Sequence, residues 1–275
     1  MSKEYVVRGG GGVGLWTGEW GRPAGPPILF IHGFMQSHLS WRAQLDGPLA
    51  EQFRLVAIDN RGHGRSDKPL EAAAYDDGGQ WADDIAAVIE TLGLHRPILA
   101  GWSYGGYIML DYFKRYGTTD VAGVNFVAAG VKRATDSALS SPTIAEIGPG
   151  LLAEDLPRRI QAVRDFLAAC TEDPVDRDCF ETWLAFNMLV PPRVCQAMLG
   201  RQLDFDDVLA ALDIPALVSH GDRDRLVLPA MAEHSLSLLP RGRASIYPGI
   251  GHAPFHEAAD RFNAELAAFA GEIAD

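Results

Sequence analysis

The chain alternates between short runs of apolar residues and longer stretches in which apolar residues recur every three or four positions. Unbroken apolar runs are typical of strands buried on both faces, whereas the longer period is typical of amphipathic helices. Because strands that alternate with helices pair in parallel, the pattern predicts an α/β fold with a mostly parallel twisted sheet between two helical layers. The predicted strands are residues 28–31, 54–59, 97–100, 121–129, 216–220 and 244–247, and the predicted helices are residues 37–50, 81–92, 107–113, 229–239 and 261–273.

The N-terminal segment follows a different pattern. Residues 5–8 and 13–20 are predicted to form two strands joined by a flexible glycine-rich hairpin. Gly9, Gly11 and Gly14 also match the G-x-G-x-x-G pattern of dinucleotide-binding loops. Such a loop opens a helix, but here alternating and aromatic residues follow, so we do not expect a dinucleotide site.

The alternation of strands and helices stops near the middle of the chain. Residues 131–208 contain no convincing strand, and they hold helical patterns such as 156–170 and 178–188 with prolines between them. This segment is too long for a simple crossover between strands. We therefore expect residues 1–130 and 209–275 to form a core domain and residues 131–208 to form a helical cap, or lid, inserted into it.

Composition excludes several classes of partner. The chain has 275 residues, 47% of them hydrophobic and 22% charged, which is ordinary for a globular protein with a sizeable core. Its formal net charge of −12 argues against binding nucleic acid or an anionic membrane by bulk electrostatics. No apolar stretch approaches the roughly 20 residues that span a bilayer, and the first residues lack the apolar segment of a secretory signal.

The cysteines point to a reducing compartment. Cys170, Cys179 and Cys195 are odd in number and form no C-x-x-C pair, so we expect free thiols and neither a zinc ribbon nor a redox motif. A cytoplasmic protein is the simplest interpretation, and the oligomeric state is left open.

The most informative stretch is Gly101-Trp102-Ser103-Tyr104-Gly105, which lies between a predicted strand and a predicted helix. In that context G-x-S-x-G is typical of a nucleophile elbow, a tight turn that lifts the serine hydroxyl clear of the sheet. Glycines two residues either side of the serine avoid a collision in such a turn. The backbone N–H of Tyr104, at the start of the helix, is then placed to stabilise a negative oxygen.

Three other loops complete a recognisable set. They are His32-Gly33-Phe34 after one strand, residues 59–66 after the next, and Gly251-His252 near the end of the chain. With Ser103 and in this order, they resemble the α/β-hydrolase superfamily over essentially the whole chain outside the expected cap. The sequence is most similar to small serine esterases, cofactor-free haloperoxidases and enol-lactonases. The resemblance implies an α/β-hydrolase fold that acts without a cofactor.

The resemblance also implies a catalytic triad. Ser103 corresponds to the nucleophile, and a serine hydroxyl needs a base within hydrogen-bond reach, for which His252 is the candidate. The acid is expected between them in the chain. Relatives usually place it three residues after a glycine, which selects Asp224 over Asp222, and Asp222 is expected to hold the loop through local hydrogen bonds.

Backbone and pocket residues follow from the same resemblance. The oxyanion hole takes one N–H from Tyr104 and the other from Phe34. The candidates for lining the substrate pocket are Trp102, His32, Trp183 and Phe186. The alternatives stay open: Phe34 and Trp102 are equally interpretable as core aromatics, the family role of His32 and His63 is structural, and Trp183 and Phe186 suit the core of the cap itself.

A metal site is not expected. His252 and His256 have the spacing of two ligands on a helix, but Pro254 breaks the helix between them and no glutamate follows His252.

The serine also narrows the reaction. Haloalkane dehalogenases and epoxide hydrolases of this fold carry an aspartate at the position of Ser103. Carbon–carbon hydrolases usually have a glycine-rich loop where this chain has residues 33–36, and cofactor-free dioxygenases take their acid after the strand that here ends at residues 126–130 without one. The first hypothesis is therefore a hydrolase of a small-molecule carboxylic ester or lactone. Those two reactions remain alternatives, and so does a receptor that keeps the triad but only binds its ligand.

Overall fold

The computed structural model describes residues 3–133 and 138–274. Its centre is an eight-stranded sheet in the order β1-β2-β4-β3-β5-β6-β7-β8, in which β2 pairs antiparallel with β1 and β4 and all other pairs are parallel. The mostly parallel α/β sheet predicted from the sequence is confirmed. The strands are β1 (Lys3–Arg8), β2 (Gly14–Gly21), β3 (Pro27–Ile31), β4 (Arg54–Ile58), β5 (Ile98–Trp102), β6 (Gly123–Val127), β7 (Ala216–Gly221) and β8 (Gly242–Tyr247).

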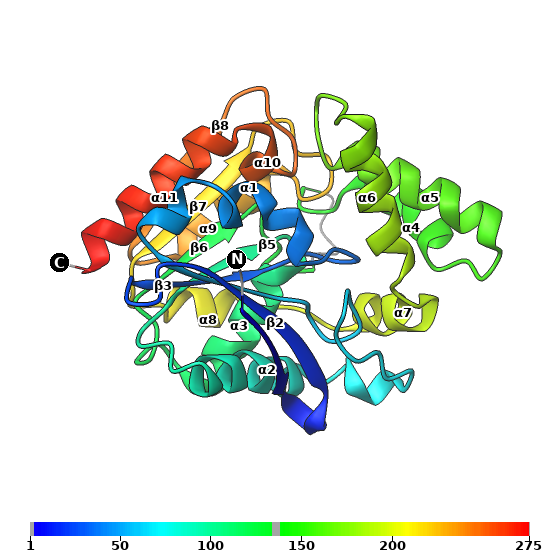
Figure 1. The fold of residues 1–275 in the computed structure, drawn as a ribbon. Coiled ribbons are helices and arrows are strands. Elements are labelled where there is room, and N and C mark those ends of the chain that lie inside the picture. Colours follow the sequence, from blue (N-terminus) through cyan, green and yellow to red (C-terminus); the bar gives the residue numbers. More distant parts are fainter. Residues whose placement is uncertain (1–2, 134–137, 275) are drawn as a thin grey trace.

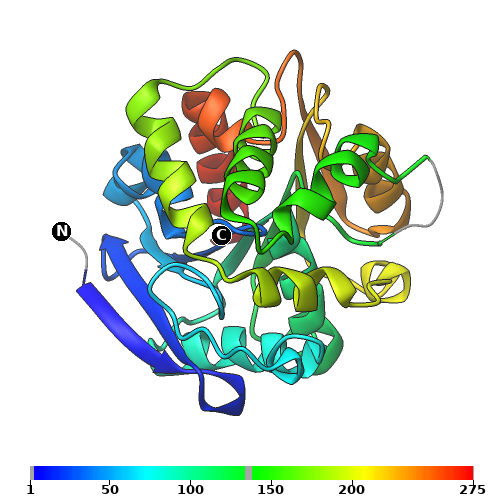
Figure 2. The same cartoon turned by 90° about the vertical axis from the view of Figure 1, so that its right-hand side faces the viewer.

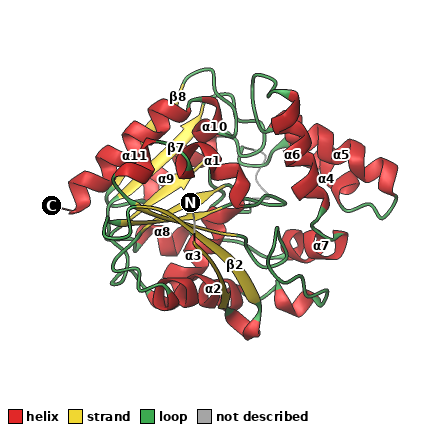
Figure 3. Cartoon of the chain, viewed as in Figure 1, coloured by secondary structure: helices red, strands yellow, loops and turns green. Residues whose placement is uncertain are grey.

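Helices cover both faces of this sheet (Figures 1 and 3). On one face α2 packs against α3, and α8 contacts both α3 and α9; on the other, α1, α10 and α11 contact one another. The helices are α1 (Arg42–Leu45), α2 (Gly78–Thr91), α3 (Tyr104–Tyr116), α4 (Pro142–Leu151), α5 (Leu156–Ala169), α6 (Arg177–Met188), α7 (Pro192–Gly200), α8 (Asp206–Ala210), α9 (Pro229–Leu238), α10 (Pro254–Glu257) and α11 (Ala259–Ala274), with short 3-10 turns at Gly10–Gly12, His38–Trp41, Pro48–Glu51 and Ala72–Ala74.

The single continuous helix predicted for residues 37–50 is wrong. The segment forms a 3-10 turn, the one-turn helix α1 and a second 3-10 turn that begins at Pro48. Proline has no N–H to continue a helix, and a side chain at Gly47 would collide with the carbonyl oxygen of Ala43, at 2.3 Å from its Cβ. The chain therefore bends here instead of extending α1.

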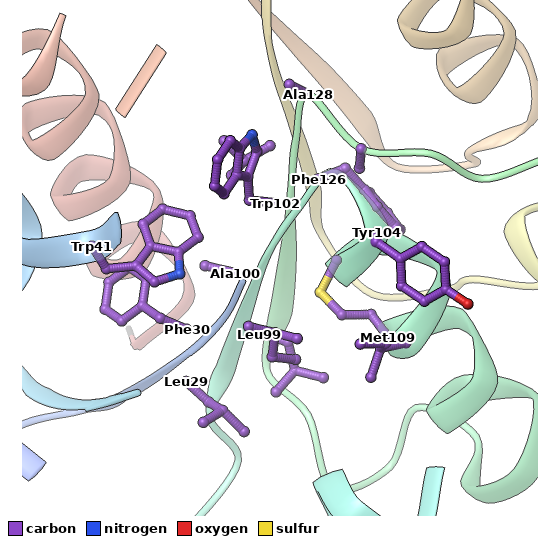
Figure 4. Packing of buried hydrophobic residues seen from close by; sticks show 14 of the residues in the cluster. Leu29, Phe30, Trp41, Leu99, Ala100, Trp102, Tyr104, Met109, Phe126 and Ala128 are labelled. Carbon is purple, nitrogen blue, oxygen red and sulfur yellow. The ribbon is translucent and has the colours of Figure 1, made fainter. Parts of the chain in front are cut away.

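The core follows the period-two alternation of the strands. Figure 4 shows Phe30, Ala100 and Trp102 on the side of Trp41, whereas Leu29 and Leu99 lie toward α3. All of these side chains are buried. Because both faces of the central strands are covered, their sequences are continuously apolar.

Helices α4 to α7 form a separate group beside the sheet, on the right of Figure 1 and facing the viewer in Figure 2. They belong to the segment predicted to be a helical cap, and among its described residues the only β pairing is the isolated bridge between Lys132 and Asp204. Arg201, directly after α7, forms a buried ion pair with Asp111 of α3, 2.6 Å between Nη2 and Oδ2. The exact limits of a cap at residues 131–208 stay a prediction.

None of the helices among residues 3–133 and 138–274 is long and apolar enough to cross a lipid bilayer.

Candidate active site

Ser103 stands alone between β5 and α3 in a conformation that few side chains adopt. Its φ of 54° and ψ of −114° lie outside the ordinary regions for an L-residue. Such a conformation costs about 1–3 kcal/mol, which interactions with the surrounding structure must offset. The flanking glycines are required by space: a Cβ at Gly101 would lie 2.8 Å from the carbonyl oxygen of Gly105, and a Cβ at Gly105 would lie 2.5 Å from that of Ile31. The local geometry is that of the nucleophile elbow predicted from the sequence.

Backbone hydrogen bonds fix this turn to the neighbouring strand. The N–H of Ser103 donates to the carbonyl of Val127 at the end of β6 over 2.9 Å, and the N–H of Gly130 donates to the carbonyl of Ser103 over 3.0 Å. The elbow is thus held on both sides of the serine.

A buried histidine–aspartate pair lies near the same end of the sheet. Nδ1 of His252, in the loop after β8, is 2.7 Å from Oδ2 of Asp224, in the loop after β7. The other carboxylate oxygen of Asp224 accepts the N–H groups of Leu226 and Val227 at 2.8 and 2.9 Å. Burial by itself would raise the pKa of Asp224, but the facing imidazoles of His252 and His220 lower it below its ordinary value. The carboxylate is therefore ionised and oriented.

Asp222 has a different environment. Its Oδ1 accepts the N–H of Gly249 over 2.7 Å, across the two loops, and its side chain is exposed. The structure thus brings Asp224 and not Asp222 to His252.

Sequence reasoning missed His220, at the end of β7. Its Nε2 is 2.8 Å from the carbonyl oxygen of Val227 and 3.2 Å from Oδ2 of Asp224, the oxygen that also faces His252. Its Nδ1 is buried and has no partner among the described residues. The available signal was its position four residues before Asp224 on the same strand–loop junction.

The loop that carries His252 is anchored from two sides. The indole N–H of Trp102 donates to the carbonyl of His252 over 2.9 Å. The carboxylate of Glu257, which sequence reasoning also missed, accepts the N–H of Gly251 at 2.9 Å and that of Glu172, between α5 and α6, at 2.6 Å. Burial raises the pKa of Glu257. One side chain thus joins the candidate base loop to the helical group α4–α7.

Two backbone N–H groups are available for an oxyanion. Tyr104 is the first residue of α3, where amides have no acceptor within the helix. The backbone N–H of Phe34 has no hydrogen-bond acceptor within the described part of the chain. The loop that holds it packs directly on the elbow, since a Cβ at Gly33 would lie 3.0 Å from the Cβ of Ser103.

Ser103 and His252 open into one cavity of about 310 Å³. Its walls are mostly apolar and include Phe34, Tyr107, Phe166, Leu199, Leu226 and Met231. Within the residues that the structure describes, the Ser103 hydroxyl and the His252 ring are not hydrogen-bonded to each other. Such contacts commonly tighten only when substrate is bound.

The four side chains expected around the pocket do not line this cavity among the described residues. Trp102 continues the alternation of β5, so its side chain lies on the face of the sheet away from the cavity. Its ring packs there against Phe255, with centroids 4.8 Å apart. His32 is fully buried and its Nε2 accepts the N–H of Asn60.

The two candidates from α6 also lie elsewhere. Trp183 meets His256 edge to face, with ring centroids 4.9 Å apart, beside a separate cleft. Phe186 is buried within α6. From the helical group α4–α7, Phe166 of α5 and Met198 of α7 reach the cavity instead.

No group of three or more His, Cys, Asp or Glu side chains with metal-binding geometry occurs in residues 3–133 and 138–274. Cys170, Cys179 and Cys195 are free, as expected, and burial raises the pKa of each thiol.

Comparisons with known proteins agree with this architecture. The family model described as the alpha/beta hydrolase family matches residues 28–265. The chain is 29% identical to a non-heme haloperoxidase of Rhodococcus erythropolis and 30% identical to a bifunctional esterase/perhydrolase of Acinetobacter calcoaceticus, in each case over 94% of this chain and 96% of the relative. The crystal structure of a candidate aryl esterase from Burkholderia cenocepacia superposes with a TM-score of 0.94 at 36% identity, covering 99% of both chains. The chain therefore belongs to the α/β-hydrolase family and is an enzyme of its esterase type.

Proposed function

We propose that this enzyme hydrolyses a carboxylic ester or lactone of a small molecule through an acyl-enzyme intermediate on Ser103. The observation that carries the proposal is the buried pair of His252 and Asp224, 2.7 Å between Nδ1 and Oδ2, in which His252 lines the same cavity as the strained elbow serine. A serine that is raised from the sheet and faces an oriented imidazole is the arrangement that nucleophilic acyl transfer requires.

The acylation step uses both residues and the two free amides. Nε2 of His252 takes the hydroxyl proton as Oγ of Ser103 attacks the carbonyl carbon. The carbonyl π electrons move to oxygen, and the N–H groups of Phe34 and Tyr104 stabilise the resulting oxyanion. As the intermediate collapses, His252 returns the proton to the leaving alkoxide oxygen, which leaves as the alcohol.

Water completes the cycle. His252 removes a proton from a water molecule that attacks the acyl carbon, and the second tetrahedral intermediate expels Oγ of Ser103, which recovers its proton from His252. Asp224 stays ionised throughout and stabilises the transient imidazolium, because its pKa lies below its ordinary value. In a lactone the alcohol and the acid are released as one molecule.

The cavity favours substrates of modest size with an apolar acyl or alcohol part. Its volume of about 310 Å³ and its aromatic and aliphatic walls suit such groups. No cofactor is needed for this chemistry, and the proposed partner is the small-molecule substrate alone.

A perhydrolase side activity is a second proposal, favoured by the name of the Acinetobacter calcoaceticus relative. If hydrogen peroxide attacks the acyl-enzyme in place of water, the product is a peracid and Ser103 is regenerated in the same way. Peracid formed from an ester and peroxide by wild type, and absent with Ser103→Ala, is the expected result.

The test of the main proposal is hydrolysis of p-nitrophenyl esters of increasing acyl length by wild type and by Ser103→Ala. We expect multiple turnovers by wild type that disappear in the variant, with the chain-length profile reporting the size of the cavity. Equal rates for both proteins would remove Ser103 from the mechanism. Release of one equivalent of product with no further turnover would instead favour a receptor that only binds its ligand, the alternative that the fold leaves open.

A further inference from the structure

His63 lies between two glycines in the loop after β4 and takes no part in the chemistry above. Its ring nevertheless contacts the loop that carries the Phe34 N–H, a proposed donor of the oxyanion hole. Nε2 of His63 is 3.1 Å from the backbone nitrogen of Met35, the residue after Phe34. His63 and Met35 are both fully buried. We propose that His63 is a positioning residue that holds the Phe34 amide in the oxyanion hole by accepting the N–H of Met35. This inference rests on the proposed function.

The direction of this hydrogen bond follows from the second ring nitrogen. Nδ1 of His63 is 2.8 Å from the carbonyl oxygen of Arg61, which can only accept, so Nδ1 carries the proton. Nε2 of the neutral ring then has a free lone pair, and the N–H of Met35 donates to it. Burial lowers the pKa of His63 to about 3, with the neighbouring His32 adding to the effect, so Nε2 remains an acceptor at the pH of ester hydrolysis.

The contact is needed because the loop is strained at Met35, whose φ is 62°. A side-chain-bearing residue keeps this left-handed conformation only where its surroundings enforce it. His63 uses the N–H of Met35 and leaves the preceding N–H, that of Phe34, free to point at the elbow. A loop relaxed at Met35 would turn the Phe34 amide away from the position of the oxyanion.

The flanking glycines let the ring point inward. Gly62 and Gly64 have φ of 79° and 45°. A Cβ at Gly64 would lie 2.1 Å from Oδ2 of Asp59, and one at Gly62 would lie 2.6 Å from Cγ1 of Val194. The G-H-G turn is therefore built to carry this imidazole under the oxyanion loop.

His32 completes the support from the other side. Its Nδ1 is 2.8 Å from the carbonyl of Gly33, which also accepts the N–H of Gln36. The carbonyl of Gly33 and the N–H of Phe34 belong to one planar peptide unit, so His32 holds that unit from its oxygen side. His63 holds the next peptide unit through the N–H of Met35, so the two histidines together fix Phe34 from both sides.

Two substitutions separate the two ring nitrogens. His63→Asn places an amide nitrogen where Nδ1 lies and keeps the donor to Arg61, but it removes the acceptor for Met35. His63→Gln places an amide oxygen near the position of Nε2 and keeps that acceptor. His95→Asn, at an exposed position, makes the same chemical change away from the site.

The readouts are kcat and KM for a p-nitrophenyl ester and the affinity for a trifluoromethyl ketone, whose serine adduct carries an oxyanion. We expect His63→Asn to lower kcat and trifluoromethyl ketone affinity in parallel, by roughly 10- to 100-fold with KM little changed, because a misplaced donor is felt mainly in the oxyanion. His63→Gln should recover most of the loss, and His95→Asn should match wild type. A His63→Asn variant with wild-type kcat, or equal losses in the Asn and Gln variants, would overturn the inference.

A measurement on wild type separates this inference from the proposed function. In 15N-labelled protein, the N–H···N hydrogen bond predicts a trans-hydrogen-bond 15N–15N coupling between the Met35 amide and Nε2 of His63, with Nδ1 protonated. Absence of that coupling overturns the inference whatever the enzyme hydrolyses, and it applies even if His63→Asn fails to fold. The proposed function is overturned by a different result, namely wild-type turnover that is absent or that does not depend on Ser103.

Discussion

The indole N–H of Trp102 donates a 2.9 Å hydrogen bond to the backbone carbonyl of His252, so the residue before the elbow serine holds the loop of the candidate base. The two rings also contact each other, with centroids 5.4 Å apart. Trp102 thereby couples the end of β5 to the loop after β8, which are separated by about half of the sequence. We expect the placement of His252 relative to Ser103 to depend on this coupling.

Trp102→Phe tests the coupling. The variant keeps an aromatic ring in the core but leaves the His252 carbonyl without its donor, which we expect to cost about 1–2 kcal/mol of unfolding free energy. A displaced imidazole should also lower kcat, by roughly 10-fold. Urea unfolding and p-nitrophenyl ester kinetics measure the two effects. Trp81→Phe is the matched control, because the indole of Trp81 donates an equally buried hydrogen bond, 2.8 Å to the carbonyl of Tyr75. If both variants lose only stability, Trp102 has no positioning role.

The choice between the two aspartates after β7 is tested by Asp224→Asn and Asp222→Asn. An asparagine at 224 cannot hold His252 in the required tautomer, and we expect kcat to fall by about 10³- to 10⁴-fold. An asparagine at 222 keeps an oxygen for the N–H of Gly249, so activity should stay close to that of wild type. The opposite ranking would show that Asp222 supplies the acid.

The elbow and the sheet were predictable because their causes are local. Gly101 and Gly105 exclude side chains that would collide with backbone, and an unbroken apolar run such as residues 28–31 is recognisable in a strand covered on both faces. The elbow and the sheet thus depend on near neighbours in the chain. The candidate set of Ser103, Asp224 and His252 came instead from the resemblance to the α/β-hydrolase superfamily, whose members place the acid and then the base after the serine in the chain.

The pocket was not predictable because it depends on how distant segments pack. Ala100 and Trp102 lie on the same side of β5 as Trp41 (Figure 4). The Trp102 ring packs there against Phe255 and does not line the cavity. In the helical group α4–α7, nothing in the periodicity of α6 distinguishes a helix that packs beside His256 from one that faces the site. The contact of His220 with Asp224 was not predictable, because only the turn after β7 brings the two side chains together.

The assignment of the cavity wall is tested by Phe166→Ala and Trp183→Ala. Phe166 lines the cavity and meets Phe34 edge-on, with centroids 6.3 Å apart, so its truncation should enlarge the site. We expect the preferred p-nitrophenyl acyl chain to lengthen in Phe166→Ala and to stay unchanged in Trp183→Ala. Both variants remove a buried aromatic ring and should lose about 3–5 kcal/mol of stability, which makes them matched controls. A changed acyl-chain preference in Trp183→Ala, with none in Phe166→Ala, would show that Trp183 and not Phe166 lines the substrate pocket.

Asp59, in the loop after β4, predicts how stability changes in acid. Its carboxylate is fully buried; Oδ1 accepts both the N–H and Nδ1–H of His38 at 2.8 Å, and Oδ2 accepts the N–H of Arg65 at 2.8 Å. Burial alone would raise the pKa of Asp59, but the hydrogen bonds and electrostatic attraction of His38, with the neighbouring His32 adding to the effect, lower it from 3.8 to about 2. The ionised form is therefore favoured by the fold. Its contribution is complete above the unfolded-state pKa and is lost as pH falls through the folded-state pKa.

A pKa lowered by this amount corresponds to about 2 kcal/mol of unfolding free energy at neutral pH, of which about half is lost by pH 3. Asp59→Asn has no such carboxylate, so it should be less stable than wild type at pH 7, and the difference should narrow by roughly 1 kcal/mol between pH 6 and pH 3. Urea unfolding followed by tryptophan fluorescence at pH 6, 4 and 3 measures that difference, in which the other carboxylates largely cancel. A gap that stays constant or widens toward acid pH would mean that the fold does not favour the ionised form of Asp59.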